Sequence, residues 1–174
     1  MQDNEILEKI FKNVNDWLNF AERKNITILS IFGIIAVISL LNLGQVHIVG
    51  KIGVCAYMVA YLGVLISSLI SMFPVRKLSA KLKNGLPNES KVNTDNMWHY
   101  QDIRKYSIDD YKNLLNGKSV QSFDKSHEDL IPQILANSHI ASKKFSCFTV
   151  SFWFSVIGFS VAIILLCISF FLTK

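Results

Sequence analysis

Three long stretches without a charged side chain constrain the fold of this chain more than any other feature. Residues 26–50, 52–75 and 145–173 contain no Asp, Glu, Lys or Arg, although these residues make up 18% of the sequence. A helix needs roughly 20 apolar residues to cross the hydrocarbon core of a bilayer, which is about 30 Å thick. Each stretch is long enough, so the sequence predicts an all-α membrane protein with three transmembrane helices.

The segment before the first span has the pattern of an amphipathic helix. Within residues 4–24, apolar side chains recur at steps of three and four, at Ile6, Ile10, Val14, Trp17 and Ala21. A cleaved signal peptide starts with a short basic region followed by a brief apolar run. Residues 4–24 are instead a long stretch with both acidic and basic residues, so we predict that the first span is retained. The apolar face could lie on the inner leaflet or pack on cytosolic helices. We favour packing, because the opposite face is not strongly cationic.

The distribution of Lys and Arg predicts the orientation in the membrane. The N-terminal stretch contains four Lys and Arg residues, and the turn between the first two spans contains one. The segment between the second and third spans contains twelve, and the tail contains one. Because cytosolic loops carry the excess of Lys and Arg, these counts predict how a multi-pass membrane protein is oriented. Its N-terminus would be cytosolic and its C-terminus outside. The expected parts are an amphipathic helix (1–25), a transmembrane hairpin (26–74), a helical cytosolic segment (75–144) and a third transmembrane helix (145–174).

Turn and cap signals divide the cytosolic segment. Residues 44–51 are the expected hairpin turn between the first two spans, and a basic helix could continue from the second span through Lys83. Ser107, followed by two acidic residues, predicts a helix start, and Asn116-Gly117 predicts its end. Ser126 could cap a last helix over residues 127–172, with one face formed by Ile131, Ile134, Leu135, Ser138, Ala141 and Phe145.

The residue pattern does not indicate an enzyme. The histidines have neither metal-ligand spacing nor an acidic partner at such a spacing, and the three cysteines, at or inside spans, have the pattern of packing thiols. No phosphate-binding glycine loop or nucleophile elbow appears in the sequence. We therefore expect no catalytic residues, no metal and no cofactor. The spans also lack acidic and basic residues, which disfavours a pump, a transporter or a voltage sensor.

Small and hydroxylated residues mark the spans. Ala56, Ala60 and Gly63 in the second span, and Ser151, Ser155, Gly158 and Ala162 in the third, are candidate faces for close helix contact. Polar residues of the spans could instead line a weakly selective pore. They are Ser30, Ser39 and Asn42 in the first span, Ser67, Ser68 and Ser71 in the second, and Ser151, Ser155 and Ser160 in the third. Three helices cannot enclose a useful conduit, so a pore would require a homo-oligomer.

Four segments, in order along the chain, resemble a known family. They are residues 15–24 (NDWLNFAERK) before the first span, Phe73-Pro74 at the end of the second, residues 100–107 (YQDIRKYS), and residues 129–145, which lead into the third. Together they resemble the Pycsar membrane effectors. Gln101 departs from the pattern, since the family usually has glycine there.

The resemblance implies a role in antiphage defence. A partner pyrimidine cyclase would make a cyclic mononucleotide, cyclic CMP or cyclic UMP, on infection. The effector would bind it as an activating ligand, impair the inner membrane, and cause growth arrest or cell death. Besides the lipid bilayer, the expected partners are that nucleotide and further copies of the chain, with no nucleic acid polymer.

A receptor for a cyclic mononucleotide needs a cation for its single phosphate charge and an aromatic or apolar surface for its base. Arg104 and the cations beside the spans could bind the phosphate. Trp17 and the tyrosines could stack on the base, and Asp102 could orient a ligand hydroxyl. The positive-inside rule and core packing explain most of these residues equally well. The candidate ligand-binding residues are Trp17, Lys24, Arg76, Tyr100, Asp102, Arg104, Tyr106 and Lys144.

Two other functions fit the same sequence. A constitutive membrane adaptor could dock a soluble partner on its cytosolic face without permeabilising the bilayer. An effector of a related system could answer a cyclic oligonucleotide, although the larger charge of that ligand would require more cations. Toxicity on overexpression would favour an effector over an adaptor. The sequence leaves open the ligand, the number of subunits, and whether damage comes from a defined pore or from general bilayer disruption.

Overall fold

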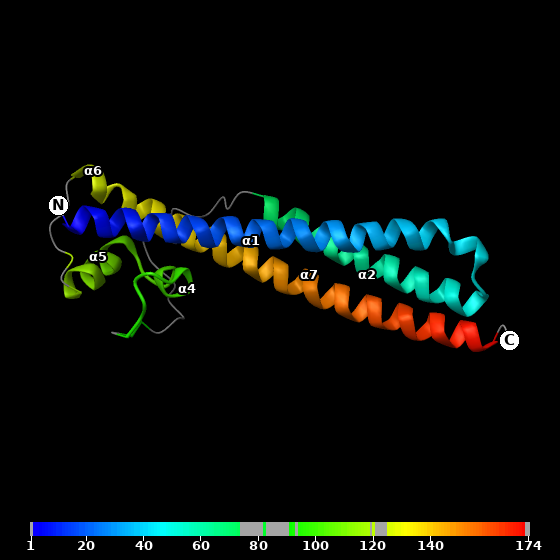
Figure 1. Cartoon of the computed structure of the whole chain (residues 1–174). Coiled ribbons are helices and arrows are strands. Elements are labelled where there is room, and N and C mark those ends of the chain that lie inside the picture. The colour runs from blue at the N-terminus through cyan, green and yellow to red at the C-terminus, as the bar shows by residue number, and fades with distance from the viewer. Residues whose placement is uncertain are drawn as a thin grey trace. The chain divides into compact units, whose positions relative to one another are not determined.

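The computed structural model describes residues 2–73, 82, 91–92, 94–118, 120 and 125–172, and every regular element in this part of the chain is helical. Three helices are long and apolar enough to cross a membrane, so the predicted all-α membrane fold with three spans is confirmed. Figure 1 shows the three spanning helices, labelled α1, α2 and α7.

The amphipathic segment and the first span form one uninterrupted helix, α1 (Gln2–Leu41). The sequence from residue 2 to residue 32 contains neither Pro nor Gly, so nothing in the backbone chemistry interrupts it. A short 3-10 turn, η1 (Leu43–Gln45), then leads to the second span, α2 (Ile48–Met72).

The hairpin turn is shorter than the sequence predicted. Residues 48–51 were expected in the turn but form the first turn of α2. His47 explains the early start, because its ring nitrogen Nδ1 accepts a hydrogen bond from the Val49 N–H at 3.5 Å and caps the helix. The predicted basic continuation of α2 through Lys83 lies almost entirely outside the described residues.

The segment between the second and third spans contains short helices, α4 (Tyr100–Ile103) and α5 (Ile108–Gly117). The Ser107 hydroxyl accepts a hydrogen bond from the Asp110 N–H at 3.2 Å, so the predicted cap of α5 is confirmed. The predicted end at Asn116-Gly117 is also correct.

The last helix begins later than predicted. Residues 125–128 form a separate helix, α6 (Lys125–Glu128), and the long helix α7 spans Leu130–Leu172. Ser126 therefore lies inside α6 and does not precede the long helix. Pro132 accounts for the break, because it has no N–H to donate to the carbonyl of Glu128 and is tolerated only in the first turn of α7. From residue 130 onward the predicted continuous helix is correct.

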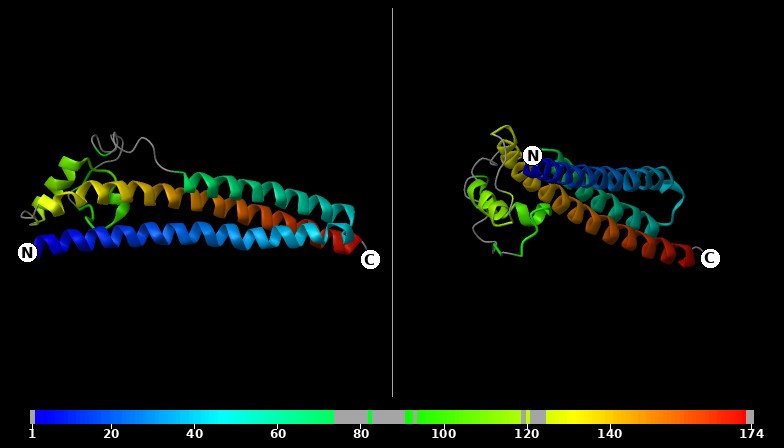
Figure 2. Two further views of the ribbon diagram at one scale, coloured as in Figure 1. Left: turned by 90° about the horizontal axis from the view of Figure 1, so that it is seen from above. Right: turned by 60° about the vertical axis from the view of Figure 1, so that its left-hand side comes forward.

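The chain folds into two compact units, each built from separate stretches of sequence. Unit 1 comprises Met1–Glu22 and Pro74–Phe145, and unit 2 comprises Arg23–Phe73 and Ser146–Lys174. Helices α1 and α7 each contribute residues to both units, and both remain helical through the boundaries at residues 22–23 and 145–146. The same helices can be followed in two further views in Figure 2.

Unit 1 has a hydrophobic core to which α1, α4, α5 and α7 contribute. Leu7, Ile10 and Val14 of α1 are fully buried against residues of the other helices, so the prediction that the amphipathic face packs on helices of the segment between the second and third spans is confirmed. The predicted face of α7 is also correct, with Phe145 half-buried and the other members fully buried: Ile131, Ile134, Leu135, Ser138 and Ala141.

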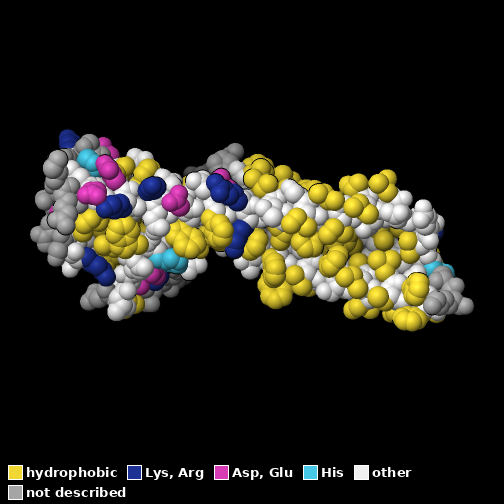
Figure 3. Space-filling model, in the orientation of Figure 1, with side chains coloured by type: hydrophobic (Ala, Val, Ile, Leu, Met, Phe, Trp, Pro, Cys, Tyr) yellow, Lys and Arg dark blue, Asp and Glu magenta, His cyan; other side chains and the backbone are white. Residues whose placement is uncertain are grey.

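Unit 2 is a bundle of the three spans, held by close helix contacts. Gly158 of α7 meets Ala60 of α2, and a methyl group added at Gly158 would lie 2.3 Å from the Ala60 side chain. Gly63 similarly meets Phe154, and Gly53 meets Ala162 and Leu165. The predicted contact of small residues between the second and third spans is confirmed at these positions. In Figure 3 the visible face of the spans is covered by hydrophobic side chains, as expected for a lipid-facing surface.

Candidate functional site

The first candidate feature of unit 1 is a group of four rings, here called the aromatic cluster: Trp17, His99, Tyr100 and Phe145. The Tyr100 ring stacks on Phe145, with centroids 5.1 Å apart and planes 18° from parallel. Trp17 lies 5.5 Å from Tyr100 and 6.1 Å from Phe145. The cluster therefore brings together α1, the start of α4 and α7, and it places two predicted stacking residues side by side.

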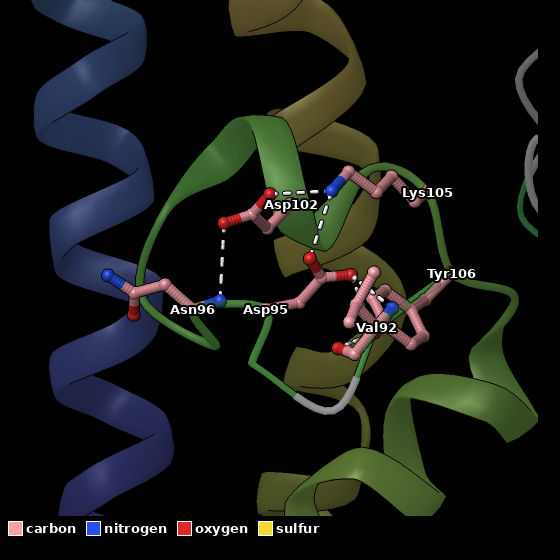
Figure 4. A network of polar contacts seen from close by, with 6 residues as sticks. All are labelled: Val92, Asp95, Asn96, Asp102, Lys105 and Tyr106. Carbon is pink, nitrogen blue, oxygen red and sulfur yellow. Dashed lines mark hydrogen bonds and ion pairs between the residues drawn. The ribbon is translucent and has the colours of Figure 1, made fainter. Parts of the chain in front are cut away.

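The second feature is a group of charged and phenolic side chains, the aspartate–lysine network of Asp95, Asp102, Lys105 and Tyr106 (Figure 4). The Lys105 ammonium donates to Asp95 at 3.0 Å and to Asp102 at 2.7 Å. The buried Tyr106 hydroxyl donates to the other oxygen of Asp95 at 2.8 Å. The Asn96 N–H donates to Asp102 at 3.2 Å, so the network fastens the loop before α4 to the turn after it.

The pKa values in the network follow from these contacts. Burial alone would raise the pKa of Asp95, but hydrogen bonds from the Val92 N–H, Lys105 and Tyr106 outweigh it and hold that pKa below its usual value. The hydrogen bond to Asp102 raises the pKa of Lys105 against the opposing effect of burial. Burial and the neighbouring Asp95 raise the pKa of Tyr106. At neutral pH Asp95 is thus a carboxylate, Lys105 an ammonium and Tyr106 a protonated phenol.

Arg104 lies next to the aromatic cluster in the chain and influences it electrostatically. Burial raises the pKa of Tyr100, while a hydrogen bond from Gln101 and the positive charge of Arg104 act in the opposite direction. Arg104 is half-buried, at the end of α4. This part of unit 1 therefore contains a cation and a group of packed aromatic rings.

The other predicted cations have different surroundings. Lys144 forms an ion pair with Glu22 at 3.1 Å in unit 1. Lys24 belongs to unit 2, where its ammonium lies 5.0 Å from the centroid of the Phe148 ring. Arg76 lies outside the described residues.

The predicted residues thus fall into two groups within unit 1. Trp17, Tyr100 and Arg104 lie in or beside the aromatic cluster, whereas Asp102 and Tyr106 belong to the aspartate–lysine network. Tyr100 and Tyr106 are only 4% and 5% exposed, so neither ring offers a free face in this arrangement. A base could stack on Tyr100 only by replacing Phe145 or Trp17.

Sequence reasoning missed His99, Phe145, Asp95 and Lys105 as members of these groups. The spacing of Asp102 and Lys105, three residues apart, was a usable signal, because such a pair meets on one helical turn. Asp95 and Phe145 gave no such signal, since their contacts join residues distant in the sequence. Within the described ranges, no group of three or more His, Cys, Asp and Glu side chains could hold a metal ion.

In the described part of unit 2, two of the open grooves have no charged lining residue. One, of about 570 Å³, is lined by α1 and α2, chiefly at Leu29, Gly33 and Tyr61. The other, of about 400 Å³, is lined by α2 and α7 and includes Gly63, Ser67 and Cys147. Their apolar character suits lipid or a neighbouring helix and does not suit a nucleotide.

A family model described as the Pycsar effector protein domain matches residues 6–172, which is nearly the whole chain and includes both units. No curated protein and no solved structure matches. With its three candidate spans, the molecule is a multi-pass membrane protein. The chain therefore belongs to the Pycsar effector family, whose general role is that of an antiphage effector.

Proposed function

We propose that this chain senses a cyclic pyrimidine mononucleotide, cyclic CMP or cyclic UMP, and responds by impairing the bacterial inner membrane, so that growth stops or the cell dies. The nucleotide would come from a partner pyrimidine cyclase during phage infection. The observation that carries the proposal is the family match over residues 6–172, because it includes both a folded, charge-bearing unit and the membrane spans.

Unit 1 is the proposed receptor. A cyclic mononucleotide carries one phosphate charge and a flat base, so it needs a cation and an aromatic surface within a few ångströms of each other. Arg104 is the cation we choose, because it lies four residues after Tyr100 and its positive charge acts on the Tyr100 hydroxyl. We assign Arg104 to the phosphate and Trp17 and Tyr100 to the base, with Asp102 orienting a ribose hydroxyl.

Binding at this place would compete with contacts that the protein makes to itself. The Tyr100 ring is stacked on Phe145, and Asp102 is paired with Lys105. A nucleotide would therefore favour an arrangement in which some of these contacts are exchanged for contacts to the ligand. A ligand shifts an equilibrium only by binding one state more tightly than the other. The continuous helices α1 and α7, which contribute to both units, are the proposed route by which that shift reaches the spans.

The membrane response requires more than one copy of the chain. Three helices cannot surround an aqueous path, and the α1–α2 and α2–α7 grooves of unit 2 are apolar surfaces on which a helix of another copy could pack. We propose a homo-oligomer in the inner membrane, with the N-terminus cytosolic and the C-terminus outside.

The first test is thermal unfolding of the detergent-purified protein with a panel of cyclic mononucleotides and cyclic oligonucleotides. We expect cyclic CMP or cyclic UMP alone to raise the melting temperature, because a ligand that binds the folded state stabilises it by mass action. Stabilisation by an oligonucleotide alone would assign the protein to a related signalling system. A melting temperature unchanged by every nucleotide would favour the constitutive adaptor.

The second test is charge reversal at the proposed phosphate contact. Arg104→Glu should abolish the nucleotide-induced shift and the growth arrest, while the protein still inserts in the membrane. Lys12→Glu, at an exposed position of the same unit, is the control and should leave both unchanged. A full response from Arg104→Glu would remove this residue from the site.

A further inference from the structure

The structure sorts the polar residues of the spans into an outward and an inward set. Ser30, Asn42 and Ser160 are exposed on the surface of the bundle. Six other serines of the spans are at most 7% exposed in unit 2. One of them, Ser169, lies near the end of α7. We call the remaining five the serine seam: Ser67, Ser68, Ser71, Ser151 and Ser155.

The seam is formed by two helices that lie against each other. Ser67 and Ser71 are one helical turn apart on α2, and Ser151 and Ser155 are one turn apart on α7. The Ser67 hydroxyl donates to the carbonyl of Cys147 at 2.9 Å, and Cys147 lies one turn before Ser151. This hydrogen bond joins the two rows of hydroxyl groups across the interface between α2 and α7.

The hydrogen bonds of the seam are incomplete. Ser155 donates to the carbonyl of Ser151 at 2.8 Å. The hydroxyl groups of Ser68 and Ser151, which are 3% and 0% exposed, have no hydrogen-bond partner among the residues that the structure describes. A buried hydroxyl without a partner is unfavourable, more so where the surroundings are hydrocarbon. Contact with water would remove this penalty.

The same interface is loosely filled beside the serines and tightly filled beyond them. The open groove of about 400 Å³ is lined mostly by apolar residues and includes one residue of the seam, Ser67, so the helices do not close completely beside that serine. Farther along, Gly158 and Ala60 are in direct contact, which leaves no room between α2 and α7. A path through the interface therefore requires the two helices to separate at Gly158.

We propose that the serine seam is the lining of a path for water and small hydrated ions, closed in this structure and opened when the effector is activated. The proposal rests on the proposed function, because it names the residues through which the membrane would be permeabilised. In the proposed homo-oligomer, separation of α2 from α7 in each copy would turn the hydroxyl groups toward a shared aqueous path, while the apolar outer faces of the helices would remain in lipid. The alternative is general bilayer disruption, in which no set of residues becomes hydrated.

Thiol accessibility tests the lining directly. In full-length protein with the three native cysteines changed to alanine, Ser68→Cys and Ser151→Cys would each be reconstituted in liposomes and treated with a charged, water-soluble thiol reagent. Both thiols should react slowly without nucleotide and at least about tenfold faster with cyclic CMP or cyclic UMP, because only the open path admits the reagent. Ser160→Cys, exposed on the same helix, is the control and should react slowly under both conditions.

Leakage of a small dye from the same liposomes separates the two proposals. Nucleotide-dependent leakage with both seam thiols unreactive would overturn the lining and leave the proposed function in place. If the unsubstituted protein causes no leakage with either nucleotide, the proposed function and the lining both fail.

A second variant tests the energetic argument with a different readout. Ser68→Ala with Ser151→Ala removes the unpartnered hydroxyl groups and should favour the closed state. We expect leakage to fall about tenfold while the nucleotide-induced thermal shift, which reports binding in unit 1, is retained. Ser160→Ala should change neither quantity. Unchanged leakage from the double variant would contradict the proposed lining.

Discussion

At the scale of single residues, Asp95 makes the most contacts in the described part of the loop before α4. It accepts hydrogen bonds from the Val92 N–H, Lys105 and Tyr106, and it is 8% exposed. Charge-assisted hydrogen bonds of this kind contribute about 1.5–3 kcal/mol each to stability when one partner is buried. Asp95 therefore stabilises the loop that positions α4 and, with it, Tyr100 and Arg104.

The first prediction concerns the pH dependence of this contribution. The pKa of Asp95 is below its usual value in the folded protein, so its contribution is complete above the unfolded pKa, about 4, and is lost as the pH falls through the folded pKa. Asp95→Asn should lower the free energy of unfolding by about 2 kcal/mol at neutral pH and flatten its decline between about pH 5 and pH 2. Thermal unfolding followed by tryptophan fluorescence would measure both.

The control for this experiment is Asp109→Asn, at an exposed position in the first turn of α5. It should change the melting temperature little and leave the acid-side decline as it is in the unsubstituted protein. The same decline in Asp95→Asn and in the unsubstituted protein would mean that other carboxylates govern acid stability.

At the scale of elements, the start of α5 was correctly predicted from its cap. The Ser107 hydroxyl accepts from the Asp110 N–H and also donates to the Asp110 carboxylate at 2.7 Å. Ser107→Ala should lower the stability of unit 1 by about 1 kcal/mol, whereas Ser107→Asn, which retains a capping oxygen, should lower it much less. Equal losses in the two variants, measured by thermal unfolding, would show that the cap does not limit stability.

The contact between α2 and α7 gives a prediction for the membrane unit. Gly158→Val would place its Cβ 2.3 Å from the Ala60 side chain, so the two helices must move apart. We expect a loss of about 1–3 kcal/mol in stability, the usual cost of overpacking a filled interface. Gly44→Val is the matched control, because no atom lies within 4 Å of its added Cβ.

Thermal unfolding in detergent would compare the two glycine variants. A melting temperature of Gly158→Val equal to that of Gly44→Val would mean that α2 and α7 tolerate separation at this point.

Sequence patterns predicted the helical elements well wherever the signal was local. Charge-free length identified the spans, four-residue spacing identified the buried face of α7, and the hydroxyl of Ser107 identified a helix start. Two helix starts were wrongly predicted, because they depend on the chemistry of single residues and not on the spacing of apolar side chains. The start of α2 depends on a histidine cap at His47, and the start of α7 depends on the missing N–H of Pro132.

The candidate site was less predictable than the fold for a physical reason. Trp17 and Tyr100 were identified as aromatic residues, but their neighbour Phe145 lies 45 residues beyond Tyr100 in the sequence, at a position assigned only to a helix face. The partner of Tyr106 is Asp95, in a loop with no periodic pattern. Contacts between distant residues depend on how the helices pack, which spacing along one helix does not reveal.

At the scale of the whole molecule, the topology across the membrane is the main expectation that a simple experiment can test. With the N-terminus in the cytosol and an odd number of spans, a reporter fused to the C-terminus should lie outside. Alkaline phosphatase fused there should be active, and a green fluorescent protein should be dark. The reverse result would place the Arg- and Lys-rich middle segment outside and exclude a cytosolic nucleotide receptor.

The construction of unit 1 from two separate stretches of chain also fixes the order of events on the ribosome. The apolar residues Leu7 and Ile10 emerge about 120 residues before their partners Ile134 and Leu135, and the hairpin of the first two spans emerges between them. At about 5–20 residues per second, this interval lasts roughly 6–24 seconds. The hairpin therefore reaches the membrane before unit 1 can fold. Translation interrupted in this interval would leave in the bilayer a hairpin without the folded unit that we propose as its receptor.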